Sequence, residues 1–273
     1  MYLKPKVKAP AQELLASTQS ILQRYRLNSV CMASRCPNIS ECFFRGTATF
    51  MILGKFCTRS CKFCSITHAK PLPPDPSEPE RLAKAISDLN LQYAVITSVD
   101  RDDLLDFGAG HFAKVVAAIK KATDAKIELL TPDFQGDEDA LAKVIAAKPY
   151  KLAHNIETVK RHHRFIKPGS SYERSLKVLH IYAKSGIITK SSLIVGLGES
   201  MQEIEETLLD LFSVGVQQIT IGQYLQPTPK QMPVQKYYTP EEFDKLEKLA
   251  KAIGFKAIAV GQLVRSSYYA ERL

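Results

Sequence analysis

The sequence predicts an α/β fold: a partial (βα)6 TIM-like barrel with a cysteine-rich N-terminal extension and a C-terminal tail. After residue 48, short apolar or β-branched runs alternate with longer segments of helical period, which is typical of βα units around a parallel sheet. Six such units fall short of the eight in a closed barrel, so we expect an open one. The expected divisions are an extension at 1–48, the barrel at 49–254 and a C-terminal segment at 255–273.

Six runs predict the strands in order, at 49–53, 93–98, 127–131, 151–156, 190–195 and 218–224, and a further apolar run lies at 255–260. Apolar stripes at helical spacing predict the intervening helices. Three helix starts carry a hydroxyl residue with glutamate three positions later, which predicts capping boxes at Ser77, Ser200 and Thr239. The six histidines show no catalytic spacing, and we expect His162 and His163 to be exposed on a helix.

Composition narrows the class of protein. An apolar content of 45% over 273 residues can fill a core, and no apolar run approaches the ~18 residues that span a bilayer. The net charge of +9 is spread along the chain, which fits either a negatively charged partner or a merely basic surface. All six cysteines lie between Cys31 and Cys64, and the first 24 residues lack a secretory or transit pattern. We therefore expect a cytoplasmic protein in a reducing compartment, with no membrane partner.

The cysteines form two triplets. Cys31, Cys36 and Cys42 are spaced C-x4-C-x5-C, and Cys57, Cys61 and Cys64 are spaced C-x3-C-x2-C just after the first strand. Each triplet offers three thiolates, whereas a structural zinc site needs four ligands; His68 is near enough in sequence to keep zinc as a minor alternative. Three soft ligands suit an iron–sulfur cubane whose fourth iron stays open. Such an iron can bind a substrate.

The second triplet, with Phe63 before its last cysteine, resembles the signature of the radical S-adenosylmethionine superfamily. The resemblance implies that the open iron binds the amino and carboxylate groups of S-adenosylmethionine. One electron then yields methionine and a 5'-deoxyadenosyl radical, which abstracts hydrogen from unactivated carbon. Cys57, Cys61 and Cys64 are thus expected both as metal ligands and as catalytic residues.

The complete pattern is similar to the lipoyl synthase family: CMASRCPNISEC, GTATFMILG and CTRSCKFC are followed by TSVDRDDL, PDFQG, HNIETV, IVGLGES, GQYLQPT and RSSY. This resemblance implies two 4Fe-4S clusters, one of them sacrificed as the sulfur donor. Sulfur enters carbons 6 and 8 of an octanoyl group bound to a carrier protein, and two S-adenosylmethionine molecules are used per lipoyl group. In this family a tail serine completes the auxiliary cluster. We choose Ser267 over Ser266, since the two point to opposite sides of an extended tail.

Polar residues on or beside strand ends are the expected S-adenosylmethionine contacts, because the chemistry of parallel βα folds collects there: Thr97, Asn155, Glu157 and Lys190. Phe63 is expected beside adenine, and Gly196 and Gly198 are expected to let the backbone approach the methionine part closely. Arg59 and Lys62 flank the second triplet, where they either offset its negative charge or lie in solvent. Arg101, Asp102 and Asp103 are expected to form ion pairs that shape a loop, as is Arg265 before the serines.

The resemblance also implies partners. They are the octanoylated lipoyl domains of 2-oxoacid dehydrogenase complexes and the glycine-cleavage H protein, reduced flavodoxin or ferredoxin as the electron donor, and an iron–sulfur carrier for cluster repair. A methylthiolating RNA-modifying enzyme is an alternative, but it normally needs an added domain, and we expect no nucleic acid partner. Biotin synthase is a further alternative with a similar fold, but the ligands of its second cluster are scattered over barrel strands, whereas the additional triplet here lies before the barrel. A non-enzymatic iron–sulfur electron carrier would have closed clusters.

Overall fold

The computed structural model describes residues 12–33, 36 and 38–273, and it divides into two compact units. The first unit holds the described part of residues 8–58 together with residues 66–152. The second unit holds residues 59–65 and 153–273 among the described residues. The CTRSCKFC loop is therefore shared, because Cys57 belongs to the first unit whereas Cys61 and Cys64 belong to the second.

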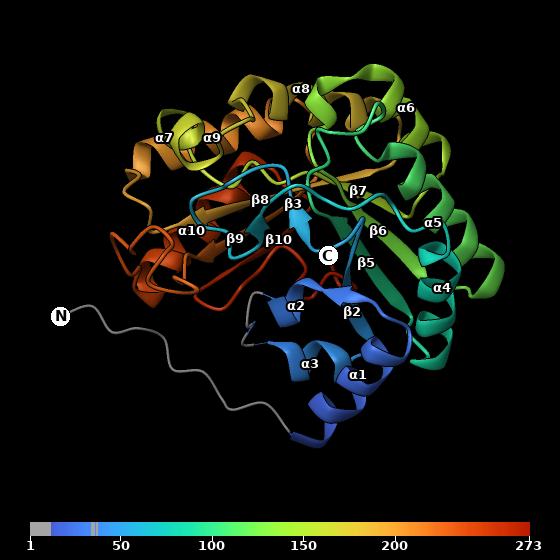
Figure 1. Ribbon diagram of the computed structural model, residues 1–273. Coiled ribbons are helices and arrows are strands. Elements are labelled where there is room, and N and C mark those ends of the chain that lie inside the picture. The colour runs from blue at the N-terminus through green and yellow to red at the C-terminus, as the bar shows by residue number, and fades with distance from the viewer. Residues whose placement is uncertain (1–11, 34–35, 37) are drawn as a thin grey trace. The chain divides into compact units, whose positions relative to one another are not determined.

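The first unit begins with short elements that lead into a parallel sheet (Figure 1). Its elements are α1 (Gln12–Arg24), β1 (Asn28–Ser29), α2 (Val30–Ala33), α3 (Ile39–Phe44), β2 (Thr47–Ile52), β3 (Phe56–Cys57), β4 (Thr67–His68), α4 (Glu78–Asp88), β5 (Tyr93–Ser98), α5 (Ala109–Ala122), β6 (Lys126–Leu130), the 3-10 turn η1 (Phe134–Gly136) and α6 (Glu138–Ala146). Strand β1 runs antiparallel to β2, and β5 lies between β2 and β6 in parallel register.

The core of the first unit lies between these strands and the helices α4, α5 and α6, which lie side by side in Figure 1. Ile96 of β5 and Leu129 of β6 are fully buried, as are Ile86 of α4 and Phe112 of α5. The ring of Phe112 meets that of Phe134 edge to face at 5.9 Å. Burial of large side chains from each element fixes the helices against the sheet.

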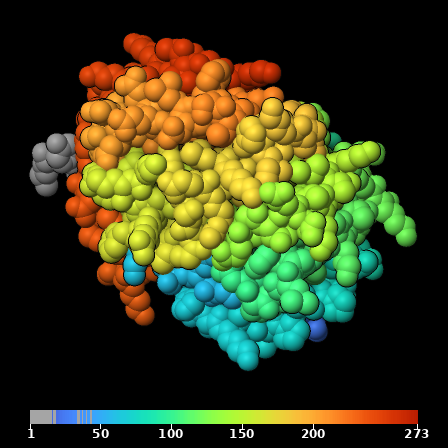
Figure 2. Space-filling model, turned by 90° about the horizontal axis from the view of Figure 1, so that it is seen from above, coloured from blue at the N-terminus to red at the C-terminus, as the bar shows by residue number. Residues whose placement is uncertain are grey.

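Strand β7 (Lys151–Ala153) spans the point in the chain where the first unit ends. The second unit continues with α7 (Lys160–Ile166), α8 (Tyr172–Lys184), β8 (Ile188–Val195), α9 (Met201–Ser213), β9 (Gln218–Gln223), α10 (Pro240–Ile253) and β10 (Ala257–Gly261). Strand β9 pairs in parallel with β8 on one side and with β10 on the other. A buried cluster that includes Leu193, Leu208, Ile221 and Leu246 joins these strands to α9 and α10. In Figure 2 the atoms coloured yellow to orange belong to this unit.

The order of the elements confirms the predicted series, since β2, β5, β6, β7, β8 and β9 are each followed by a helix before the next barrel strand or β10. Strand β5 has the predicted bounds. Strand β7 ends three residues earlier than predicted, at Ala153, and β8 begins two residues earlier, at Ile188. The run after α10 forms β10, which extends the parallel pairing beyond β9. None of the helices in the described ranges is long and apolar enough to cross a bilayer.

Two of the three predicted capping boxes are confirmed. The hydroxyls of Ser200 and Thr239 accept from the backbone N–H three residues on, and Glu203 and Glu242 accept from the cap residues in return. The box predicted at Ser77 is wrong, although α4 begins just after it. The Ser77 hydroxyl instead donates to Asp75 at 2.7 Å and accepts from the Arg81 guanidinium, and its backbone is helical rather than extended as at the two confirmed boxes.

Candidate functional site

The first cysteine triplet lies in the first unit, packed against the start of the sheet. Cys31 is in α2, Cys42 is in α3, and the backbone N–H of Cys36 donates to the Cys31 carbonyl at 2.9 Å. The neighbouring Cys36 side chain, burial and the charge of Cys42 raise the pKa of the Cys31 thiol. Neighbouring thiolates repel one another unless cations are bound among them.

Strand pairing and one arginine support this triplet. The Ser29 hydroxyl donates to the Thr49 carbonyl at 3.0 Å, which ties the segment just before Cys31 to β2. The Arg45 guanidinium lies 3.9 Å from the sulfur of Cys42 and also contacts Glu41. A cation beside a sulfur favours its thiolate form. The cysteine spacing alone did not point to Arg45, although it lies three residues after Cys42 in the sequence.

Cys57, the first cysteine of the second triplet, is held by the loop after β5. The Asp100 N–H donates to the Cys57 sulfur at 3.3 Å, and an Asp100 carboxylate oxygen lies 3.5 Å from the same sulfur. The next residue, Thr58, donates its N–H and its hydroxyl to the Asp100 carbonyl, at 3.1 Å and 3.0 Å. The TSVDRDDL segment thus fixes the cysteine, a role for Asp100 that no pattern in the sequence indicated.

The other two cysteines belong to the second unit. The Cys64 N–H donates to the Cys61 carbonyl at 3.1 Å, so the two cysteines close a tight turn. Gln231 donates its side-chain amide to the Cys64 carbonyl at 3.2 Å. Between the cysteines, Phe63 packs on an apolar cluster that contains Leu197. A ring at this place sits next to the loop after β8, where we predict an S-adenosylmethionine contact.

Asn155 and Glu157 meet beyond the end of β7. The Asn155 side-chain amide donates to a Glu157 carboxylate oxygen at 3.0 Å, and Lys167 donates to the Asn155 carbonyl at 3.0 Å. Burial raises the pKa of Glu157, and the charge of Lys167 and the bond from Asn155 only partly oppose it. The backbone of Glu157 is left-handed, with φ of 68°. A half-buried carboxyl group held in a strained conformation is typical of a ligand contact.

The loop after β8 is organised by Glu199. One of its carboxylate oxygens accepts from the Gly196 N–H at 2.6 Å, and the other accepts from the Leu197 N–H at 2.8 Å. Gly196 has φ of 105°, and a Cβ atom there would lie 2.3 Å from the Gln223 side-chain nitrogen. The lack of a side chain at Gly196 thus makes room for another part of the same chain, the Gln223 side chain. Gly198 lies at the rim of the loop, where its carbonyl accepts from Arg161 at 3.1 Å.

The remaining predicted contacts lie at opposite ends of strands. Thr97 is the penultimate residue of β5 and pairs with Met51 and Leu130. Lys190 lies near the start of β8, where it pairs with Gln218, and its side chain is fully buried. The strand therefore separates Lys190 from the Gly196 loop, which follows the other end of β8.

The serine pair lies in a turn, so the premise of an extended tail is wrong. The Tyr268 N–H donates to the Arg265 carbonyl at 2.9 Å, which places Ser266 and Ser267 at the two central positions of a β-turn. Both serines are half-buried. The choice of Ser267 remains a prediction, since the alternation of an extended chain does not apply to a turn.

Two arginines of the predicted loops are buried, and so is one of the histidines that we expected in solvent. Arg59 is buried with its side chain against Gly169, and Arg101 is buried in a two-pronged ion pair with Asp103, with both contacts at 2.8 Å. The predicted loop-shaping role of Arg101 is confirmed. The expectation of exposed histidines is wrong: His163 is buried edge to face against the Tyr172 ring, and His162 is half-buried. The face of α7 that carries His163 turns toward α8.

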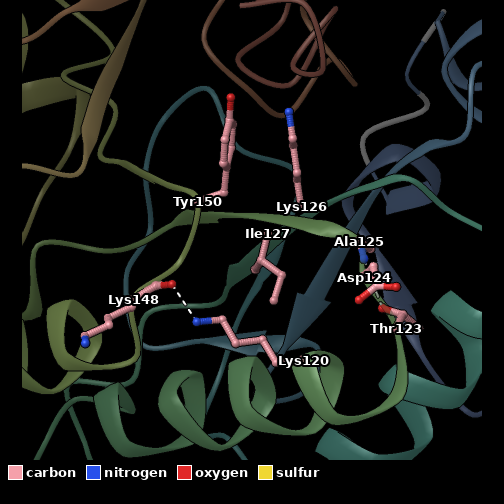
Figure 3. Close-up of a pocket in the computed structure, with 8 residues that line it drawn as sticks. All are labelled: Lys120, Thr123, Asp124, Ala125, Lys126, Ile127, Lys148 and Tyr150. Carbon is pink, nitrogen blue, oxygen red and sulfur yellow. Dashed lines mark hydrogen bonds between the residues drawn. The ribbon is translucent and has the colours of Figure 1, made fainter.

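A cavity of about 310 Å³ lies elsewhere in the first unit, at the amino end of β6 (Figure 3). Lys120, Lys126, Lys148 and Tyr150 are among its lining residues, and Lys120 donates to the Ala147 and Lys148 carbonyls. The ammonium of Lys126 lies 4.5 Å from the centre of the Tyr150 ring. The residues that line this cavity include none of the cysteines and none of the predicted S-adenosylmethionine contacts.

The donor sets fit iron–sulfur clusters. Within the described ranges, no group of three His, Cys, Asp or Glu side chains is arranged to hold one metal ion. A 4Fe-4S cluster requires a different arrangement, because each cysteine binds its own iron. Cys57 receives a backbone hydrogen bond, and Cys42 has a guanidinium beside it; both contacts stabilise thiolate ligands of a cluster.

The comparisons with known proteins agree with this chemistry. The family model of the Radical SAM superfamily matches residues 51–211. Lipoyl synthase of Mannheimia succiniciproducens is 50% identical over 97% of this chain and 85% of its own length. Lipoyl synthase of Buchnera aphidicola is 50% identical over 92% of this chain and 81% of its own length.

Solved structures show the same fold at low sequence identity. Streptococcus suis SuiB bound to the precursor peptide SuiA has a TM-score of 0.63 and 12% identity, over 96% of this chain and 57% of SuiB. Methylornithine synthase (PylB) has a TM-score of 0.57 and 13% identity, over 94% of this chain and 87% of its own. The α/β fold with its parallel strands is thus that of a radical SAM partial barrel, a fold that works with an iron–sulfur cluster and S-adenosylmethionine. The chain belongs to the lipoyl synthase family of the radical SAM superfamily.

Proposed function

We propose that this enzyme inserts two sulfur atoms, at C6 and C8, into an octanoyl group carried by a lipoyl domain. In this proposal Cys57, Cys61 and Cys64 hold the cluster that binds S-adenosylmethionine, and Cys31, Cys36, Cys42 and Ser267 hold the cluster that donates sulfur. The single observation that carries it is the presence of two separate cysteine triplets, each fixed by its own backbone contacts. When bound, the cluster held by Cys57, Cys61 and Cys64 would supply one electron to S-adenosylmethionine, and the auxiliary cluster would supply sulfide.

The protein's own groups then have defined tasks. The Asp100 N–H orients and stabilises the Cys57 thiolate, and Gln231 fixes the turn that carries Cys64. The Glu157 carboxyl group, oriented by Asn155, is suited to accept hydrogen bonds from the hydroxyls of a ribose. The loop shaped by Glu199 lies beside Phe63, and it would receive the methionine part of S-adenosylmethionine.

An oxygen ligand at the auxiliary cluster suits a group that must give up sulfide. A serine oxygen binds iron without adding the soft thiolate that would hold the cluster more firmly. The turn at Arg265–Tyr268 presents two such hydroxyls at its corner. We assign the ligand to Ser267, and replacement of Ser266 and Ser267 in turn by alanine tests this choice.

The partners follow from the same chemistry. We propose octanoylated lipoyl domains of 2-oxoacid dehydrogenase complexes and the glycine-cleavage H protein as substrates, with reduced flavodoxin or ferredoxin as the one-electron donor. An iron–sulfur carrier would rebuild the spent cluster, and the reducing cytoplasm would preserve the thiolates. The net charge of +9 favours acidic partners, so binding of a carrier domain should weaken as salt is raised.

Anaerobic reconstitution tests the function. Wild-type protein should bind two clusters, and Cys31→Ala and Cys57→Ala should each lose one, as counted by iron and acid-labile sulfide per chain. Given reductant, S-adenosylmethionine and an octanoylated carrier, wild type should form 5'-deoxyadenosine and a product with two added sulfur atoms. Cys31→Ala should still cleave S-adenosylmethionine without sulfur insertion. A wild-type product without added sulfur would falsify the proposal.

A further inference from the structure

The tail that follows β10 is attached to the carboxyl end of β9. Gly222 pairs with Gly261 at the last step of the β9–β10 ladder. Beyond it, the Gln262 side chain donates to the Tyr238 carbonyl at 3.0 Å. The Arg265 guanidinium donates to the carbonyls of Gln223 and Val264, both at 3.0 Å. The serine turn therefore begins from a residue bound to the end of β9.

Gly222 permits this attachment because it has no side chain. A Cβ atom there would lie 2.0 Å from the Val264 carbonyl oxygen, which is far closer than two such atoms can approach. The φ of Gly222 is not in the left-handed region, so any residue can adopt its backbone conformation. Only the space taken by Val264 demands glycine.

Gln223 is the next residue, and its buried carboxamide points toward the loop after β8. The side-chain nitrogen donates to the carbonyls of Val195, Tyr224 and Lys236, at 3.2, 3.1 and 2.9 Å. The side-chain oxygen accepts from the Tyr238 N–H at 2.9 Å. The two amide hydrogens are thus shared among three carbonyls, and together with the bond to the oxygen they hold the side chain between two strand ends and the segment before α10.

Tyr238 continues the connection to the Gly196 loop. Its hydroxyl donates to the Glu199 carboxylate at 2.9 Å, and the same oxygen accepts from the Gly196 N–H. Burial and the charge of Glu199 raise the pKa of Tyr238, so the hydroxyl stays protonated as a donor at neutral pH. An unbroken chain of contacts therefore runs from Gly196 to the turn of the serines.

We propose that Gln223 is a positioning residue that couples the Gly196 loop to the serine turn. This inference rests on the proposed function, in which the loop contacts S-adenosylmethionine and Ser267 binds the auxiliary cluster. Its side chain sets the loop through the Val195 and Lys236 carbonyls, and its backbone carbonyl sets the tail through Arg265. A displacement of the Gly196 loop therefore displaces the serine turn, and release of the serine from the cluster alters the position of the loop.

Gln223→Glu is the first test, because it keeps the shape of the side chain and replaces its donor by an oxygen that faces three carbonyls. Gln218→Glu is the matched control, since Gln218 is a buried glutamine at the opposite end of the same strand. Hydrogen exchange of the anaerobically purified full chain is the readout. Gln223→Glu should speed exchange in both residues 196–199 and residues 262–268, and Gln218→Glu should leave both segments unchanged.

Gly222→Ala is the second test, because it displaces the tail through Val264 while the Gln223 side chain remains intact. It should speed exchange in residues 262–268 and, through Arg265 and Gln223, in residues 196–199. If either variant alters only the segment next to it, the coupling is disproved. Both variants should retain a cooperative thermal transition, which separates loss of coupling from loss of folding.

The role toward the cluster needs a readout other than catalysis. In a background with Cys57, Cys61 and Cys64 replaced by alanine, bound iron reports the auxiliary site alone. Gln223→Glu should release this iron to a chelator several-fold faster than Gln218→Glu does. Equal release rates from a loaded site would overturn the positioning role. If the background protein holds no iron, the proposed function fails instead, and the exchange experiment still decides the coupling.

Discussion

The backbone N–H of Asp100 donates a 3.3 Å hydrogen bond to the sulfur of Cys57, and the Asp100 carboxylate lies 3.5 Å from that sulfur. The two residues are separated by 43 positions in the chain. The N–H bond stabilises a thiolate, whereas the carboxylate places a second negative charge beside it. The potential of a cluster bound there depends on both.

Asp100→Asn should raise the reduction potential of the cluster held by Cys57, Cys61 and Cys64. The substitution removes a negative charge beside Cys57 and keeps the backbone N–H bond, so the reduced, more negative cluster becomes easier to form. We expect an upward shift on the order of tens of millivolts, measured by a redox titration monitored by electron paramagnetic resonance. Asp124→Asn, in the remote cavity, should leave the potential unchanged. An unchanged potential in Asp100→Asn would show that this carboxylate does not act on the cluster.

Glu157→Gln should stabilise the protein and weaken S-adenosylmethionine binding. Burial raises the pKa of Glu157 above 4.5 in the folded state, so the folded protein holds this proton more tightly than the unfolded chain. Wild type therefore loses stability as pH rises from the unfolded-state pKa through the folded-state pKa, whereas Gln is unaffected. The melting temperature of the variant should exceed that of wild type increasingly over this window and then by a constant margin.

The affinity of Glu157→Gln for S-adenosylmethionine can be measured by calorimetry. Loss of a charged acceptor should lower affinity for S-adenosylmethionine by roughly 10- to 100-fold. Glu173→Gln offers a control, because that carboxylate is exposed on α8. Undiminished affinity in Glu157→Gln would remove Glu157 from the binding site.

Asp103→Asn should destabilise the fold more than Arg101→Met. Arg101 is buried, with its side chain 1% exposed, whereas the Asp103 side chain is 37% exposed. Loss of the carboxylate strands a buried cation, but loss of the cation leaves a carboxylate that water can reach. We expect a cost of about 3 kcal/mol for Asp103→Asn and about 1 kcal/mol for Arg101→Met. Urea unfolding measures both, and the reverse order would contradict this account.

Removal of the hydroxyl should cost more stability at the two capping boxes than at Ser77, which makes no cap bond. Ser200→Ala and Thr239→Ala each remove a bond to an otherwise unsatisfied N–H and should cost about 1 kcal/mol in the free energy of unfolding. Ser77→Ala should cost measurably less, because the Ser77 hydroxyl makes no cap bond to α4. Equal losses at all three positions would show that cap geometry is not the cause.

The order of the elements and the chemistry of the ligands could be predicted from local sequence patterns. Apolar periodicity placed β5 at its observed bounds, and the hydroxyl and glutamate pairs at Ser200 and Thr239 marked two helix starts correctly. These signals are local, since a few neighbouring residues fix the period and the cap. The two cysteine triplets were likewise readable from spacing alone.

Contacts between residues distant in the chain could not be predicted and follow only from the packing of the elements. This packing placed Asp100 against Cys57 and Val264 in the space above Gly222, and it folded the serine pair into a turn. It also buried His163, which an exposed helix pattern had placed in solvent. Such contacts depend on which faces pack together once the strands have paired, and no pattern within a short window encodes that choice.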